Sequence, residues 1–238
     1  PDLASIHPLD AEAPDEEIML LEQSFYSTMP PAFCNLPSYV QWLENHDNTP
    51  GYEYLQRLLQ LLQWQKKQKG EAAQRWLLKA PHHLHHMDIL FKVFKDAKVV
   101  QSHRDPLETI PSIASFNAAL WKLGADSVDE KVVGAFTSRK YAKGMIDSMA
   151  VREQHPDAVL DVHYRETIKT PLETIAKVYD FIGMALTDEA RSAMQQWQVD
   201  NKRENRVAHN YTLEQFGYSE ASLKELFSAY RQQFIEPQ

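Results

Sequence analysis

An arginine and a serine in the middle of this chain have the types and spacing that suit an anionic ligand. Arg104 follows the apolar run 98–102, and Asp105-Pro106 comes directly after it. Aspartate before proline, with Glu108 three residues on, is typical of a capped helix start. A helix N-terminus and an arginine fork both favour a phosphate. Ser112, two turns into the predicted helix, adds a hydroxyl. The alternative is an ordinary capped helix with a surface arginine.

A lysine and four histidines gather in a second stretch. Lys79 ends the apolar run 75–79, and histidines follow Pro81 at positions 82, 83, 85 and 86. Imidazole titrates near neutral pH, so one of these side chains is a candidate general base. A zinc site is the alternative, because His82 and His86 are four residues apart, but the stretch has no HExxH pattern. In the third interpretation most of these histidines are solvated.

Other patterns that carry chemistry are absent or incomplete. His103-Arg104-Asp105 lacks the asparagine that a kinase loop needs five residues later, since Ile110 stands there. The seven glycines have neither the GxGxxG nor the GxxxxGK spacing of phosphate loops. The single cysteine excludes an intramolecular disulfide. The acidic run 15–17 suits a helix N-terminus, and the aromatic residues Trp42, Tyr52, Tyr54 and Trp64 suit a core.

The elements that must position these residues are mainly helical, and the fold class is α/β. Helical patterns cover 16–26, 39–43, 49–65, 81–94, 106–123, 129–153, 170–183, 188–199 and 219–234. Short strands are predicted at 75–79, 98–102 and 158–163. Strands that alternate with helices imply a parallel sheet with helical crossovers, whose ligands bind beyond the carboxyl ends of the strands. We expect one domain over 1–238, helical in 1–70 and α/β in 71–238.

The composition excludes several partners. Lys plus Arg is 25 and Asp plus Glu is 33, a net charge of −8, which argues against nucleic acid and against an anionic membrane surface. No apolar run approaches the roughly 20 residues of a membrane span. A secretory signal pattern is absent, and with the lone cysteine this predicts a cytoplasmic protein. The sequence carries no signal of an oligomeric state.

Four segments, taken together, resemble the sulfotransferase family, most closely its bacterial branch. They are WLLKAPHHL (76–84), FKDAKVVQSHRDPLETIPSIASF (94–116), LDVHYRETIKTPLETIAKVYDFIG (160–183) and HNYTLEQFG (209–217). All four occur in the family's order and spacing, and the resemblance covers most of the chain. It implies a P-loop-like parallel sheet surrounded by many helices. It also implies transfer of a sulfuryl group from 3′-phosphoadenosine-5′-phosphosulfate to a hydroxyl or amine, without a metal.

The resemblance also implies roles for particular residues. Arg104 and Ser112 match the pair that binds the 3′-phosphate of the donor. Lys79 matches the lysine at the transferring group, and His83 matches a histidine that we take as the candidate base, with His82 as its alternative. Tyr164 matches a tyrosine near the adenosine. Three later residues fall where related enzymes close a loop over the 3′-phosphate: Arg206, His209 and Tyr211.

The chain departs from the family pattern in one important respect. The family's 5′-phosphosulfate loop is a Gly/Ser/Thr-rich turn after an N-terminal strand, and nothing here matches it. We therefore expect a fragment of a longer sulfotransferase, without the central N-terminal strand, and whether this fragment is active by itself stays open. Its acceptor is a small molecule or glycan, bound on the side of residues 1–70. Two other hypotheses are a non-catalytic nucleotide-binding or interaction protein on the same scaffold, and a helical metal protein that uses the histidines.

Overall fold

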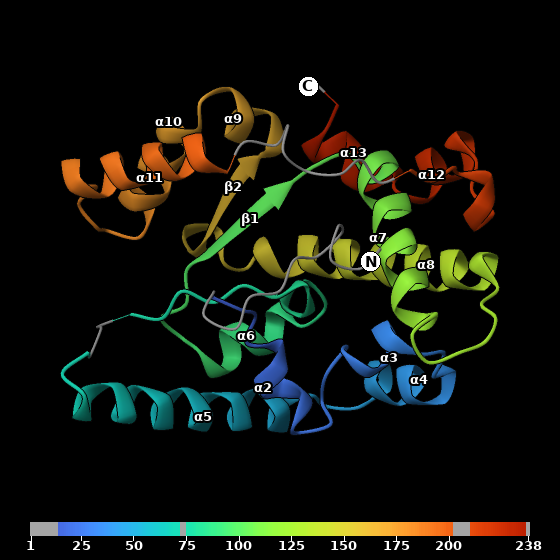
Figure 1. Ribbon diagram of the computed structural model, residues 1–238, viewed down its shortest axis with the longest axis horizontal. Helices are drawn as coiled ribbons and strands as arrows, with labels where there is room; N and C mark the ends of the chain where they lie inside the picture. The colour runs from blue at the N-terminus through green and yellow to red at the C-terminus, as the bar shows by residue number, and fades with distance from the viewer. Residues whose placement is uncertain (1–13, 72–74, 202–209, 237–238) are drawn as a thin grey trace.

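A pair of parallel strands lies at the centre of the computed structural model, which describes residues 14–71, 75–201 and 210–236 (Figure 1). The strands are β1 (Val99–His103) and β2 (Val159–His163). Their register places Val99 opposite Val159 and His103 opposite His163, so both strands end at the same edge. The two helices between them form the crossover that parallel strands require. The predicted parallel arrangement of strands and helices is confirmed.

Four helices make up the N-terminal part of the described chain. They are α2 (Ile18–Glu22), α3 (Pro30–Phe33), α4 (Pro37–Asn45) and α5 (Thr49–Gln68). Proline in the first turn of α3, α4 and α5 fixes the start of each helix, because its missing N–H has no intrahelical partner there. Leu55 and Leu59 of α5 pack on Leu21 of α2 and form a small core with Trp76 and Leu78.

The remaining elements follow in chain order. They are η1 (Pro81–His85), α6 (Met87–Val93), α7 (Pro106–Trp121), α8 (Glu130–Arg152), η2 (Pro156–Ala158), α9 (Tyr164–Lys169), α10 (Pro171–Phe181), α11 (Asp188–Asp200), η4 (Glu214–Phe216), α12 (Glu220–Leu226) and α13 (Ser228–Phe234). The largest core lies where α7 and α8 meet the C-terminal helices, around Ile110, Val133, Phe216 and Tyr230. Thus the chain's C-terminal end supports the helix that follows β1.

The predicted strand over 75–79 is wrong. The segment is extended, and its side chains alternate: Trp76 and Leu78 pack inward while Leu77 is 96% exposed. However, it pairs with no strand in the part of the chain that the structure describes, where the sheet has two strands. A strand needs a neighbour for its backbone groups. Here the Lys79 amide donates instead to a carboxylate oxygen of Glu17 at 2.8 Å.

Two predicted helices are each divided. The helix expected over 81–94 is a 3₁₀ turn, η1, followed by α6, and His86 interrupts it with φ −141° and ψ 35°. The helix expected over 219–234 is broken at Phe227 into α12 and α13. The first division matters for chemistry, because the histidines stand on a tight turn rather than along one face of an α-helix.

Candidate active site

The edge where β1 and β2 end brings two of the predicted site residues together. Arg104 follows β1 and Tyr164 follows β2. Because the strands are parallel and in register, these residues leave the sheet side by side. The Arg104 guanidinium carbon lies 4.3 Å from the centre of the Tyr164 ring, a cation–π contact. A cation and an aromatic face therefore stand together beyond the carboxyl ends of the strands, where open parallel sheets bind ligands.

The start of α7 beside Arg104 is capped, although not in the way the sequence predicts. An Asp105 carboxylate oxygen accepts from the Leu107 N–H at 3.0 Å, as expected of a cap. The Glu108 carboxylate does not complete a capping box; it accepts from Arg104 at 2.8 Å. The Arg104 side chain is still 37% exposed, so its charge remains accessible. Ser112 is exposed on α7, and its hydroxyl forms no hydrogen bond within the described residues.

Helix α13 and the residue before α7 are joined by an ion pair that holds this corner in place. Arg231 donates from Nε and Nη2 to the two Asp105 carboxylate oxygens, at 3.0 and 3.2 Å. His103 is buried between the Tyr230 hydroxyl at 2.7 Å and the Asp161 carboxylate at 2.8 Å. Burial lowers the pKa of His103, although Asp161 opposes that effect. His103 is thus a neutral packing residue, and the C-terminal helix holds the cap residue in place.

Lys79 and His83 form a second group, linked through two adjacent glutamates. The Lys79 ammonium pairs with Glu16, and 75% of the lysine side chain is exposed. His83 places Nε2 against the Glu17 carboxylate and Nδ1 2.8 Å from the Tyr52 hydroxyl. The Glu17 carboxylate also receives the Lys79 amide. Hydrogen bonds therefore join Tyr52, His83 and Glu17 in one chain.

The pKa values of Glu17 and Tyr52 indicate which groups of this hydrogen-bonded series carry protons. Burial raises the pKa of Glu17, which is only 6% exposed, but the hydrogen bond and charge of His83 outweigh it and hold that pKa below its usual range. Burial, and then the charge of Glu17, raise the pKa of Tyr52 well above normal. Tyr52 thus stays protonated, with its hydroxyl hydrogen-bonded to Nδ1 of His83, while Nε2–H of His83 donates to the Glu17 carboxylate.

Glu17 and Tyr52 are the residues that the sequence analysis missed. It assigned Glu17 to a helix N-terminus and Tyr52 to a core. Glu17 is 66 residues from His83 along the chain, and Tyr52 is 31 residues from it. No local pattern indicates that these three side chains meet, because only the packing of α2 and α5 beneath η1 brings them together.

Of the other histidines, His82 and His86 pack against each other, and His85 packs against Tyr141. The His82 ring is fully buried, with Nδ1 accepting from the Thr28 N–H at 3.4 Å, and it lies 4.5 Å from the His86 ring. Across the ranges 14–71, 75–201 and 210–236, no three His, Cys, Asp or Glu side chains are placed to hold a metal ion. Arg206 and His209 lie outside the described residues, and Tyr211 packs, half-buried, on the main core.

Comparison with known proteins identifies the family. A sequence model of the Sulfotransferase family matches residues 1–188. The chain belongs to this family. Two curated relatives, both named omega-hydroxy-beta-dihydromenaquinone-9 sulfotransferase Stf3, come from Mycobacterium bovis and Mycobacterium tuberculosis. Each is 23% identical over 164 residues, which are 65% of this chain and 40% of the relative.

Two solved sulfotransferases share the fold. Sulfotransferase STF9 from Mycobacterium avium matches 96% of this chain with a TM-score of 0.85 and 25% identity. Sulfotransferase STF1 from Mycobacterium tuberculosis matches 94% with a TM-score of 0.77 and 31% identity. The P-loop-like α/β fold class is thus confirmed. The chain spans 58% and 57% of these two structures. None of its described helices is both long enough and apolar enough to cross a bilayer.

Proposed function

We propose that this sulfotransferase-family chain takes part in sulfuryl transfer from 3′-phosphoadenosine-5′-phosphosulfate to a hydroxyl or amine. The acceptor is a small molecule or glycan, and residues 1–70 contribute its side of the site. The observation that supports the proposal best is the corner of Arg104 and Tyr164 beside the capped start of α7. A half-exposed cation, an aromatic face and a helix N-terminus suit a nucleotide phosphate and its base.

In this proposal the corner binds the nucleotide end of the donor. The Arg104 guanidinium receives the 3′-phosphate beside the start of α7, and the Ser112 hydroxyl adds a hydrogen bond. The Tyr164 ring lies against the adenosine. Three residues beyond α11 close over the same phosphate: Arg206, His209 and Tyr211. The phosphate competes with Glu108 for Arg104, and it is the stronger partner because it offers more charge and more acceptor oxygens.

The transfer itself is an in-line displacement. The acceptor oxygen or nitrogen bonds to sulfur as the bond from sulfur to the bridging oxygen breaks, and the 5′-phosphate leaves with the electron pair. The Lys79 ammonium neutralises the charge that develops on that bridging oxygen. It is free to do so because its pair with Glu16 is exposed and weak. Positioning and charge stabilisation suffice for such a step, without a covalent intermediate on the enzyme or a metal.

The proton of the acceptor passes to the His83–Glu17 pair. Both ring nitrogens of His83 are engaged, so the imidazole does not act alone. An acceptor hydroxyl that approaches Glu17 displaces the Nε2–H contact or shares the carboxylate. In either arrangement the pair holds one proton more after transfer. The Tyr52 hydroxyl keeps the ring oriented, and this positioning role follows from its fixed protonation.

Calorimetric titration with adenosine-3′,5′-bisphosphate tests the donor corner. Arg104→Ala removes a charge-assisted contact of roughly 1.5–3 kcal/mol, so we expect binding about 10- to 100-fold weaker. Arg165→Ala is the matched control, because Arg165 is exposed on α9 next to Tyr164. Equal affinity in Arg104→Ala and the unmodified chain would overturn the 3′-phosphate assignment. A folded chain that fails to bind the bisphosphate would overturn the donor site as a whole.

A second candidate function is nucleotide binding without catalysis. It is supported by the corner alone, because Arg104 and Tyr164 can hold a nucleotide without any transfer step. An assay with ³⁵S-labelled donor and a pool of hydroxylated and amino compounds separates the two functions. Label in an acceptor supports transfer. Bisphosphate binding without labelled product supports the non-catalytic function for this chain.

A further inference from the structure

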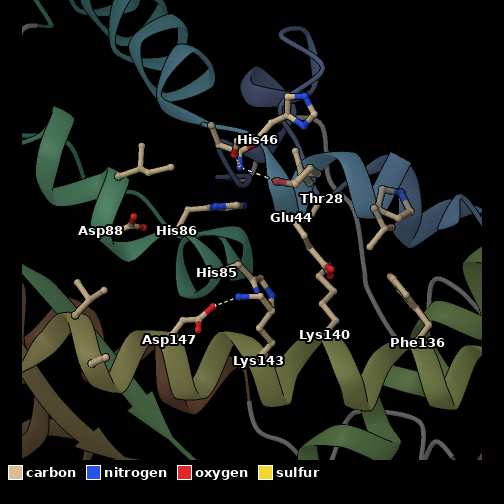
Figure 2. Close-up of a pocket in the computed structure, with 17 residues that line it drawn as sticks. Thr28, Glu44, His46, His85, His86, Asp88, Phe136, Lys140, Lys143 and Asp147 are labelled. Atoms are coloured by element: carbon tan, nitrogen blue, oxygen red, sulfur yellow. Dashed lines mark hydrogen bonds and ion pairs between the residues drawn. The ribbon is translucent and has the colours of Figure 1, made fainter. Parts of the chain in front are cut away.

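A cavity of about 380 Å³ lies on the other side of the histidine turn (Figure 2). Its walls come from three regions: the N-terminal segment from Thr28 to Asn48, the turn η1 with the start of α6, and helix α8. The volume is that of a small-molecule site. Val40, Leu43 and Ile89 give it an apolar side. Close packing of α8 on η1 fixes the two walls relative to each other: a Cβ atom on Gly144 would lie 2.3 Å from Nδ1 of His85.

Two polar atoms in the cavity wall are buried and have no partner among the described residues. One is Oδ1 of Asn48, whose residue is only 3% exposed. The Asn48 amide nitrogen is already used, since it donates to the Leu43 and His46 carbonyls at 2.8 and 3.0 Å. The other atom is Nε2 of His85. Buried polar atoms are nearly always hydrogen-bonded, so both point to a polar ligand group.

Lys140 adds a cation to the same cavity. Figure 2 shows its side chain extending from α8 towards Glu44 of α4. Two of the three carboxylates in the wall have cationic partners: Glu44 accepts from Arg139 at 3.1 Å, and Asp147 pairs with Lys143 at 2.5 Å. The third, Asp88, forms no ion pair with a described residue. Lys140 itself forms no ion pair within the described residues; its ammonium lies over the rings of Phe136 and Tyr141, and the charge of Glu44 acts on it.

The charge state of the cavity follows from burial. Burial lowers the pKa of Lys140 to about 8, with Glu44 opposing the effect. Burial likewise lowers the pKa of His86 to about 4 and holds that of His85 well below normal, so both imidazoles are neutral. The other charged or titratable groups in the wall are Glu44, His46, Asp88, Lys143 and Asp147. Lys140 is therefore the cation of the wall that forms no ion pair with a described residue, although the charge of Glu44 acts on it.

We propose that this cavity binds a small organic monoacid. Its carboxylate sits at Lys140 and His85, its apolar body lies along Val40, Leu43 and Ile89, and a hydroxyl or N–H group reaches Asn48. Two of these contacts meet buried atoms that have no hydrogen-bond partner in the described chain, Nε2 of His85 and Oδ1 of Asn48.

The site is separate from the proposed proton-accepting pair. The Tyr52 ring lies between the two, 5.6 Å from the His83 ring and 6.3 Å from the His86 ring. Tyr52 and His82 are both fully buried, and neither lines the cavity. A ligand in the cavity thus contacts one end of the turn whose other side carries His83. It is a second site and not the route by which the acceptor reaches Glu17.

Calorimetry with 4-hydroxyphenylacetate as probe tests the proposal on the unmodified chain. We expect saturable 1:1 binding, with 4-hydroxyphenylacetamide at least about tenfold weaker because it lacks the charge. Lys140→Met should weaken the acid by at least about tenfold and leave the amide unchanged. Lys131→Met is the control, since Lys131 is an exposed lysine at the start of the same helix. Adenosine-3′,5′-bisphosphate should bind Lys140→Met normally, which separates this site from the donor corner.

The pH dependence gives a second test that needs no variant. The acid requires the protonated form of Lys140, so its affinity should be constant from about pH 6 to 7, where the ligand is a carboxylate, and should fall as pH rises through about 8. No binding of the acid at millimolar concentration would overturn the proposal. Equal binding of acid and amide, or equal losses in Lys140→Met and Lys131→Met, would overturn it as well.

Discussion

The strand corner and the histidine turn are built in opposite ways, although each carries two of the residues that the sequence singles out. At the corner, Arg104 and Tyr164 follow two paired strands and meet because the register places them together. At the turn, Lys79 and His83 find their partners in segments far away along the chain. The corner is thus positioned by local structure and the turn by tertiary packing.

Burial separates the two regions further. The ion pair between Arg104 and Glu108 is exposed, and exposed pairs of this kind contribute about 0–1 kcal/mol to stability. Glu17, by contrast, is almost completely buried with His83. At the corner, Arg104 can leave Glu108 and bind a ligand at little cost in free energy. At the turn, the hydrogen bonds of His83 are already formed before any ligand binds. This suits a binding site in the first region and a proton-handling site in the second.

The largest expected effect is on turnover at the turn. His83→Ala removes half of the proposed proton-accepting pair, so transfer to any acceptor that the unmodified chain labels should slow by about 10²–10⁴-fold. Bisphosphate affinity should be unchanged, because the corner is intact. Near-normal turnover in this variant would move the role to a neighbour such as His82. That neighbour is fully buried against Thr28, so the structure favours His83.

The second effect is on stability, and it compares two adjacent carboxylates. Glu17→Gln leaves His83 and the Lys79 amide with a poorer acceptor in a buried place, so we expect a loss of about 2–3 kcal/mol in unfolding free energy. Glu16→Gln breaks only the exposed pair with Lys79 and should cost under about 1 kcal/mol. Urea unfolding at pH 7 measures both. Equal losses in the two variants would contradict the contrast between buried and exposed pairing.

The contribution of Glu17 should also depend on pH in a defined direction. Its folded pKa is held below the unfolded value of about 4.3. The stabilisation is therefore complete above that value and is lost as pH falls towards the folded pKa. The unfolding free energies of the unmodified chain and Glu17→Gln should converge below about pH 4. A difference that stays constant down to pH 3 would count against ionised Glu17 as its source.

The sequence predicts the elements around the corner well because their signals are local. Apolar runs mark β1 and β2, and Asp105-Pro106 marks the start of α7. The prediction fails at 75–79, where a short apolar run has no neighbouring strand to pair with among the described residues. An apolar run indicates that a segment is packed; it does not indicate a hydrogen-bonding partner.

The candidate site divides in the same way. The resemblance to the family names Arg104 and Tyr164, and the structure brings them into contact. Glu17 and Tyr52 escape notice because an acidic helix start and a buried aromatic are ordinary features of folded chains. What makes them unusual is their common partner, His83, and that is a fact of packing alone.

A third, smaller effect tests how rigidly α8 holds the turn. Gly144→Ala would place a methyl group 2.3 Å from the His85 ring, so overpacking should outweigh the gain in helix propensity and cost about 1 kcal/mol. Gly124→Ala is the control: nothing lies within 4 Å of its added methyl group, and it should be neutral or stabilising by up to about 1 kcal/mol. Thermal unfolding compares the two. Equal stability of both variants would mean that η1 yields easily and that its hydrogen bonds are less fixed than their burial implies.

The smallest effect concerns the aromatic face at the corner. Tyr164→Leu removes the ring that stacks under Arg104, a contact of about 0.5–1 kcal/mol at an exposed site, so bisphosphate affinity should fall about two- to fivefold. Tyr164→Phe keeps the ring and should bind nearly as the unmodified chain does. If Tyr164→Phe is as weak as Tyr164→Leu, the hydroxyl rather than the ring is responsible. If neither variant changes the affinity, Arg104 binds the phosphate without help from the Tyr164 ring. The corner would then depend on one side chain, whereas the histidine turn depends on the contacts of His83 with Glu17 and Tyr52.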